Sequence, residues 1–155
     1  MIETIIVPLD GSELAESALP LAHELQRKLQ ARLVLVRAIE PPGSSLATAP
    51  GVLEPPAGVA AEIDLAQKIG HEERRTAQAY LEALAGRLGA GPIETVIVED
   101  SAADAIVRLA KARAGAMVVM SSHGRGGLGR LVFGSVADAV LRRSPAPVTL
   151  VRHGA

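Results

Sequence analysis

The feature that most constrains this chain is the regular alternation of short apolar runs with longer segments of helical periodicity. Between the runs, apolar residues recur every three or four positions. The runs themselves are almost continuously apolar, which is typical of parallel strands covered on both faces. The pattern predicts one doubly wound α/β domain over residues 1–155, with a five-stranded parallel sheet and helices on both faces. The expected strands are residues 4–7, 33–39, 93–98, 116–120 and 147–151.

The first two connections differ in their composition. Residues 12–29 are expected to form one helix with a bend at Pro20, because proline lacks the N–H that an interior helical residue donates. Residues 41–58 are rich in Pro, Gly, Ser and Ala without periodicity, which predicts a long loop. A second helix is expected over about 59–88, with Gly70 as the position where its first half would break.

Two later helices carry N-terminal signals. Ser101 and Ser135 are each followed three residues later by an aspartate, Asp104 and Asp138. This spacing resembles a capping box, in which the serine caps the helix and the acidic side chain complements the helix dipole. Both serines are therefore expected to be N-cap residues.

The composition excludes several classes of protein. The 155 residues include 16 basic and 17 acidic ones, which gives a net charge of −1. The chain therefore lacks the strong positive field that is typical of proteins that bind nucleic acid or anionic lipid. The single Tyr and single Phe offer little stacking surface for single-stranded nucleic acid. The absence of Cys rules out thiol chemistry and suits a reducing compartment. The N-terminal segment, MIETIIVPLDGSE, resembles neither a signal peptide nor a membrane span, so we expect a cytoplasmic protein.

A glycine-dense stretch, SSHGRGGLGRLVFGSV at 121–136, follows the fourth apolar run and can be aligned with three nucleotide motifs. The GxGxxG spacing starting at Gly124 would need an acidic residue about 20 positions further on, whereas the next strand ends at Arg152. The P-loop spacing over 124–130 lacks both the lysine and the hydroxyl that bind phosphate and Mg²⁺. Both assignments are therefore disfavoured.

The third spacing is Gly124, nine residues, then Gly134-Ser135. It places a glycine loop between the end of a strand and the start of a helix, where backbone N–H groups and the helix dipole attract anions. Ligands of such sheets bind at the carboxyl ends of the strands, so Asp10, after the first strand, is expected beside this loop. The spacing predicts a site for a phosphorylated ligand.

Two separated motifs resemble those of the universal stress protein family. One is VPLDGS at 7–12. The other is the family's nucleotide-binding spacing of glycine, two residues, glycine, nine residues, glycine and serine or threonine, here SSHG at 121–124, nine residues, then Gly134-Ser135. The closing segment at 144–152 is also similar, so the resemblance covers nearly the whole chain. It implies a Rossmann-like fold of the adenine nucleotide alpha hydrolase type.

The resemblance also implies a site, a cofactor and a partner. The cofactor would be ATP, with or without Mg²⁺, and the partner a second copy paired through residues 148–152. Asp10 and Ala38 would line the adenine and ribose end, and Met120 and Ser121 would lie along the sugar. The full set of expected nucleotide-binding residues is Pro8, Asp10, Ala38, Met120, Ser121, Gly124, Arg125, Gly134, Ser135 and Val136. Ser121 departs from the family pattern, because it stands where the motif has its first glycine.

Each functional assignment has a simpler structural alternative. Asp10 can be a turn former whose carboxylate accepts from nearby N–H groups, and Ser135 can be only a helix cap. Arg125 can be a solvated loop residue. His123 has no acid or nucleophile that must lie beside it, and the histidines lack metal-ligand spacing, so no catalytic or metal residues are assigned.

Two functions remain open for the chain. One is a nucleotide-responsive, ATP-binding regulatory module in stress response. The other is a dimeric interaction module of the same fold that binds no nucleotide. Without a Walker lysine or an evident base, ATP hydrolysis is expected to be slow or absent.

Overall fold

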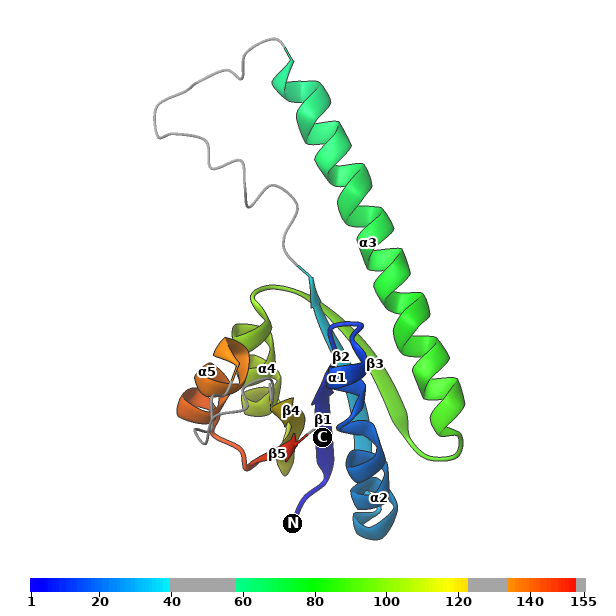
Figure 1. Ribbon diagram of the computed structural model, residues 1–155, viewed down its shortest axis with the longest axis vertical. Helices are drawn as coiled ribbons and strands as arrows, with labels where there is room; N and C mark the ends of the chain where they lie inside the picture. Colours follow the sequence, from blue (N-terminus) through cyan, green and yellow to red (C-terminus); the bar gives the residue numbers. More distant parts are fainter. Residues whose placement is uncertain (40–57, 123–133, 153–155) are drawn as a thin grey trace.

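The computed structural model describes residues 1–39, 58–122 and 134–152. Strands and helices alternate through this part of the chain (Figure 1). The elements are β1 (Thr4–Pro8), α1 (Glu13–Glu16), α2 (Leu19–Leu29), β2 (Arg32–Ile39), α3 (Val59–Leu88), β3 (Ile93–Glu99), α4 (Ala102–Ala112), β4 (Ala116–Ser122), α5 (Ser135–Arg143) and β5 (Val148–Arg152). The loop predicted at 41–58 lies, except for Gly58, outside the described residues.

The five strands form one parallel sheet in the order β3-β2-β1-β4-β5. The predicted fold class is confirmed, and so are the predicted strands, whose ends differ from the observed ones by no more than two residues. β1 lies at the centre and β5 at one edge, as the sequence predicts for a closing strand. The central strands are buried because helices cover both of their faces.

The helices divide between the two faces of the sheet (Figure 1). α1, α2 and α3 pack against one apolar cluster, and α4 and α5 pack against another. Neighbouring strand residues point to opposite faces, so Ile5 belongs to the first cluster and Ile6 to the second. This two-sided burial explains why the strands are continuously apolar in sequence.

The prediction of one helix bending at Pro20 is wrong, because this stretch forms two helices. α1 ends at Glu16 and α2 begins at Leu19, so Pro20 lies in the first turn of α2. A first-turn residue has no intrahelical acceptor for its N–H, so proline costs nothing there. Ser12 caps α1 by accepting from the N–H of Ala15 at 3.1 Å.

The prediction that Gly70 breaks the next helix is also wrong, because α3 is continuous over 30 residues. One interior glycine costs only about 1 kcal/mol relative to alanine, and good helix formers surround it. An i,i+4 ion pair of 2.7 Å between Asp64 and Lys68 lies one turn before it. The predicted end is confirmed, since Gly89 is the C-cap with a φ of 79°.

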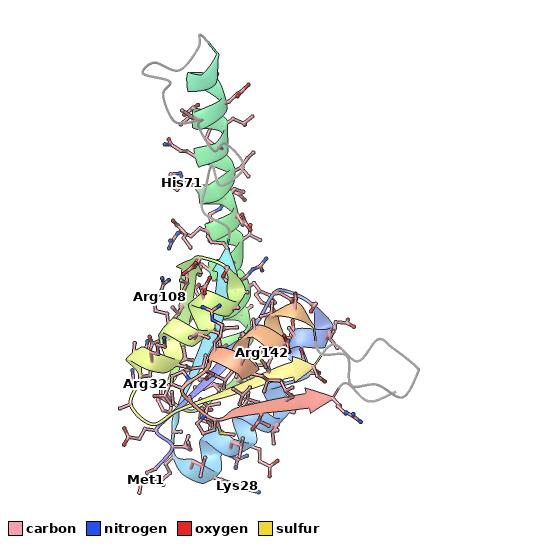
Figure 2. The ribbon with its side chains drawn as sticks, turned by 90° about the vertical axis from the view of Figure 1, so that its left-hand side faces the viewer. Met1, Lys28, Arg32, His71, Arg108 and Arg142 are labelled. Atoms are coloured by element: carbon pink, nitrogen blue, oxygen red, sulfur yellow. The ribbon has the colours of Figure 1, made fainter. Side chains whose placement is uncertain are left out.

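Only the C-terminal half of α3 packs against the sheet. Ala77, Leu81 and Leu84 are buried there, whereas the N-terminal half extends past the end of the sheet (Figures 1 and 2). Ile63 and Ile69 on this extension are 43% and 59% exposed. No helix in the described ranges is both long and apolar enough to cross a membrane.

The two predicted capping boxes have different outcomes. Ser101 is the N-cap of α4 and accepts from the N–H of Asp104 at 3.3 Å, as predicted. Ser135 is not an N-cap, because α5 begins one residue earlier than predicted. Ser135 is its first helical residue, and Gly134 is the N-cap. The carbonyl of Gly134 already accepts from the N–H of Asp138 at 2.9 Å, which places Ser135 inside the first turn.

Candidate functional site

The sheet has a topological switch point between its two central neighbours, β1 and β4. After β1 the chain enters α1 on one face, whereas after β4 it enters α5 on the other face. The two connections diverge, which opens a crevice at the carboxyl ends of these strands. The sequence predicts a ligand site at this crevice.

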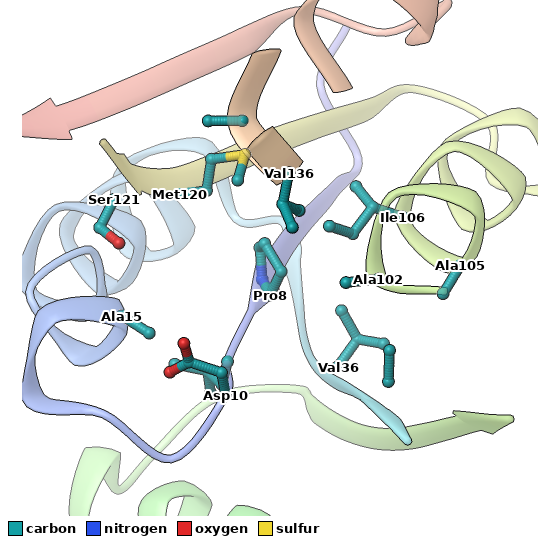
Figure 3. Close-up of a pocket in the computed structure, with 13 residues that line it drawn as sticks. Pro8, Asp10, Ala15, Val36, Ala102, Ala105, Ile106, Met120, Ser121 and Val136 are labelled. Atoms are coloured by element: carbon teal, nitrogen blue, oxygen red, sulfur yellow. The ribbon is translucent and has the colours of Figure 1, made fainter. Parts of the chain in front are cut away.

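A cavity of about 120 Å³ lies at the switch point. Strands β1, β2 and β4 and helices α1, α4 and α5 all contribute to its wall (Figure 3). The lining residues are Pro8, Leu9, Asp10, Ala15, Val36, Ala38, Ala102, Ala105, Ile106, Met120, Ser121, Val136 and Ala137. Only Asp10 and Ser121 among them have polar side chains, so the cavity is a largely aliphatic slot.

The polar and apolar sides of the cavity are separated. Figure 3 shows Val36, Ala102 and Ile106 along one side and Asp10 and Ser121 on the other. An apolar wall suits a flat, weakly solvated group, whereas a carboxylate and a hydroxyl suit a group rich in hydrogen-bonding atoms. The arrangement therefore fits a ligand that is itself apolar on one side and polar on the other.

The structure brings most of the sequence-predicted site residues to this cavity. Those that line it are Pro8, Asp10, Ala38, Met120, Ser121 and Val136. Gly134 and Ser135 are at the start of α5, immediately before the lining residue Val136. Gly124 and Arg125 lie outside the described residues. Within the parts of the chain that the structure describes, no group of three His, Asp or Glu side chains is placed to hold a metal ion.

Part of the cavity wall could not be predicted from the sequence. Val36, Ala105 and Ile106 line the cavity, yet no motif includes them. Their only sequence signal is apolar character near the end of β2 and on the inner face of α4. That signal is the same as the signal for core packing, so it could not identify a ligand wall.

Asp10 forms the turn that leads into α1. Its Oδ1 accepts from the backbone N–H of Ser12 at 2.9 Å and from the Ser12 hydroxyl at 2.6 Å. Gly11 between them has a φ of 88°, a conformation that other residues adopt only with strain. The turn-forming role of Asp10 therefore holds, and the same carboxylate also lies on the cavity wall.

Arg37 of β2 packs against this turn. A Cβ atom on Gly11 would lie 3.2 Å from the Arg37 Nη1, so the guanidinium packs closely beneath this residue. The Arg37 Cζ also lies 5.5 Å from the centre of the Tyr80 ring, within cation–π range. Arg37 thus connects the turn beside the cavity to helix α3.

Tyr80 connects α3 to α1. Its hydroxyl donates to the Glu16 Oε1 at 3.0 Å, and Arg87 pairs with the Glu16 Oε2 at 3.0 Å. Burial raises the pKa of Tyr80 well above its ordinary value. The hydrogen bond to Glu16 and the negative charges of Glu16 and Asp10 add to this rise, and Arg37 opposes it. The phenol is therefore held in its neutral, donating form.

The opposite wall is stabilised by contacts between α4 and α5. The Ser101 hydroxyl donates to the Asp104 Oδ2 at 2.6 Å, and Arg143 of α5 forms an ion pair with Asp104. The Ser101 hydrogen bond, followed by the Arg143 interaction, lowers the pKa of Asp104. These contacts hold together the two helices that contribute Ala102 and Val136 to the cavity.

Comparison with known proteins gives the family. The profile of the universal stress protein family matches residues 1–152. The chain belongs to the universal stress protein family. A universal stress protein of Thermus aquaticus is 30% identical over 152 residues, which cover 98% of this chain and 100% of the relative. One of Mycobacterium tuberculosis is 30% identical over 150 residues, covering 96% of this chain but 45% of the relative, so the chain spans about half of that protein.

Solved structures agree with the fold. The hypothetical protein MJ0577 superposes with a TM-score of 0.77 at 21% identity, covering 100% of this chain and 99% of that one. A universal stress protein in complex with cAMP gives 0.59 at 25% identity, with 96% and 95% covered. One from Archaeoglobus fulgidus in complex with dAMP gives 0.58 at 20% identity, with 97% of each chain covered. Some structural neighbours in this family therefore bind adenine nucleotides.

Proposed function

We propose that this universal stress protein binds an adenine nucleotide in the cavity between β1 and β4 and acts in the cytoplasm as a nucleotide-responsive regulatory module. ATP, with or without Mg²⁺, is the first candidate ligand. The observation that carries the proposal is an aliphatic slot, with its polar side chains on one side, at the switch point of a parallel sheet. Slots at this position are where doubly wound sheets bind nucleotides.

The apolar side of the slot would hold the base. Val36, Ala102 and Ile106 present aliphatic surface to the cavity. Adenine is flat and mostly apolar on its faces, so such walls can enclose it without an aromatic partner. Carrying over the family pattern, the backbone around Ala38 would meet the polar edge of the base.

The start of α5 would hold the phosphates. Gly134 makes no side-chain cap hydrogen bond, so this helix start lacks the side-chain acceptor that usually takes up a first-turn N–H. A nine-residue helix also directs the positive end of its dipole to this point. Asp138 in the first turn opposes an anion, but it is paired with Arg142 at 2.9 Å. In the proposal, Gly124, Ser135 and Val136 complete the phosphate site with the charge of Arg125.

The ligands of the related structures support the choice of adenine nucleotides. The two complexes described above contain cAMP and dAMP, which share the adenine base and one phosphate. They differ in their sugars, so they favour the class of ligand without selecting one member of it. Slow or absent hydrolysis remains our expectation for ATP, and we assign no catalytic residue.

We also propose a homodimer formed through β5. This strand is at the edge of the sheet, and its residues Val148, Leu150 and Val151 are only partly buried. An apolar edge strand usually needs a pairing partner, and a second β5 would supply one. Sedimentation velocity at micromolar concentration should give the mass of a dimer, and a purely monomeric species would refute this part of the proposal.

A melting experiment tests nucleotide binding. ATP, ADP, AMP and cAMP would each be added with and without Mg²⁺, and GTP would serve as the control for base selectivity. A ligand present at a thousand times its Kd adds about 4 kcal/mol to stability, which for a domain of this size raises Tm by on the order of 10 °C. A flat response to all four adenine nucleotides would favour the dimeric interaction module without nucleotide binding.

A further inference from the structure

The polar side of the cavity contains the hydroxyl of Ser121, the residue that departs from the family motif. Ser121 is partly buried at the carboxyl end of β4 and lines the cavity. In Figure 3 it lies on the side of Asp10 and Ala15, away from Ile106. Among the lining residues that the structure describes, Asp10 is the only other one with a polar side chain.

The next residue on the strand provides a direct contrast. Ser122 is 6% exposed, and its hydroxyl donates to the carbonyl of Val151 at 3.3 Å. Successive residues of a strand point to opposite faces, so Ser121 and Ser122 are directed differently. Ser122 is therefore used in fastening β4 to β5, whereas no hydrogen bond of the Ser121 hydroxyl occurs within the described residues.

We propose that Ser121 determines sugar specificity: its hydroxyl, in the same cavity as the Asp10 carboxylate, binds a ribose hydroxyl, so the site prefers ribonucleotides to deoxyribonucleotides. This inference rests on the proposed function. It assigns to Ser121 a contact that a glycine at this position could not make. The serine then acts as part of the binding surface and does not merely narrow the cavity.

The chemistry of the two side chains suits a sugar. A carboxylate only accepts hydrogen bonds, whereas a serine hydroxyl both donates and accepts, so together they can satisfy neighbouring sugar hydroxyls. The opposite side, around Val36 and Ile106, offers no side-chain hydrogen bond and suits the base. A site that pairs with a ligand hydroxyl disfavours the analogue that lacks it, because its own polar group is left unpaired. One neutral hydrogen bond corresponds to about a twofold to tenfold difference in affinity.

Two substitutions separate a hydroxyl contact from a steric effect. Ser121→Ala keeps the Cβ atom and removes only the hydroxyl, whereas Ser121→Gly removes both. Ser122→Ala is the matched control, because it removes a hydroxyl from the adjacent residue of the same strand. Calorimetric titration would measure the Kd of ATP, 2′-deoxyATP and 3′-deoxyATP for the unchanged protein and the three variants.

The unchanged protein is expected to bind ATP about fivefold more tightly than at least one of the deoxy analogues. Ser121→Ala and Ser121→Gly should abolish this ratio by weakening only the nucleotides that carry the contacted hydroxyl, and Ser122→Ala should retain it. Equal affinities in the unchanged protein, or a ratio that survives Ser121→Ala, would overturn the inference while leaving the proposed function intact. Tighter binding of all three nucleotides by Ser121→Gly with an unchanged ratio would also overturn it. Failure of the unchanged protein to bind any of the three nucleotides would overturn the proposed function itself.

Discussion

A substitution that fills the cavity should weaken ligand binding without destabilising the fold. Ala102→Leu is such a substitution. Ala102 is a partly buried residue at the start of α4, on the apolar side of the cavity (Figure 3). A leucine side chain there extends into the space of about 120 Å³ that the base would occupy. Binding should weaken while the fold becomes slightly more stable, because the added carbons are shielded from water.

The size of each effect follows from the site. Leucine adds three carbons to alanine, and each fully buried CH₂ contributes about 0.8 kcal/mol. The position is only partly buried, so roughly half of that sum, about 1 kcal/mol, is expected, which raises Tm by about 2–4 °C. A base forced against the new side chain meets an overpacking cost of about 1–3 kcal/mol, equivalent to about a fivefold to 150-fold loss of affinity.

Calorimetric titration with ATP and a thermal melt without nucleotide would measure the two effects. Ala112→Leu is the control, because it makes the same change at an exposed position of the same helix. The control should leave the Kd for ATP unchanged and should shift Tm by no more than about a degree. Unchanged ATP affinity in Ala102→Leu, with the fold intact, would refute the placement of the base in this cavity.

Two further predictions concern the helices. Tyr80 is the only tyrosine, so absorbance near 295 nm reports its ionisation directly. The pKa of free tyrosine is about 10. Because the pKa of Tyr80 is raised, its ionisation in the native protein should require a higher pH. The stability gained from the neutral form of Tyr80 is complete below a pH of about 10 and is lost as the pH rises toward the native pKa. Glu16→Gln should lower that native pKa. Ionisation of Tyr80 near pH 10 in the native protein would contradict its contact with Glu16. Leu81→Ala, at a position with 0% exposure, should cost about 2–5 kcal/mol in urea unfolding. Ile69→Ala on the projecting half of α3 should cost less than about 0.5 kcal/mol, and equal costs at the two sites would show that this half is packed.

The sheet could be predicted from sequence because burial on both faces leaves an unambiguous mark. Strands such as β1 and β4 are continuously apolar, and their order along the chain is that of a doubly wound fold. The errors concern local helix chemistry. Pro20 and Gly70 each weaken a helix interior, but the position within the turn and the quality of the flanking residues decide the outcome.

The residues that line the cavity could be predicted where they stand at the ends of strands, but not where they also pack in the core. Asp10 and Ser121 follow or end apolar strands, so topology alone places them at the switch point. Ile106 is on the inner face of α4, where a core residue and a ligand contact have the same sequence pattern. The N-cap of α5 was predicted one residue too late, at Ser135, because the neighbouring Gly134 can also occupy that position.

Methionine-methyl NMR can show whether the cavity at the carboxyl ends of β1 and β4 binds an adenine nucleotide. The chain has three methionines: Met120 lines the cavity, Met117 packs with the cluster on the other face of the sheet, and Met1 is exposed. In a titration with ATP, binding in this cavity should give a saturable shift of the Met120 methyl resonance and little change in the other two. A Met120 resonance that stays unchanged at saturating ATP, or that moves no more than Met1 and Met117, would contradict it.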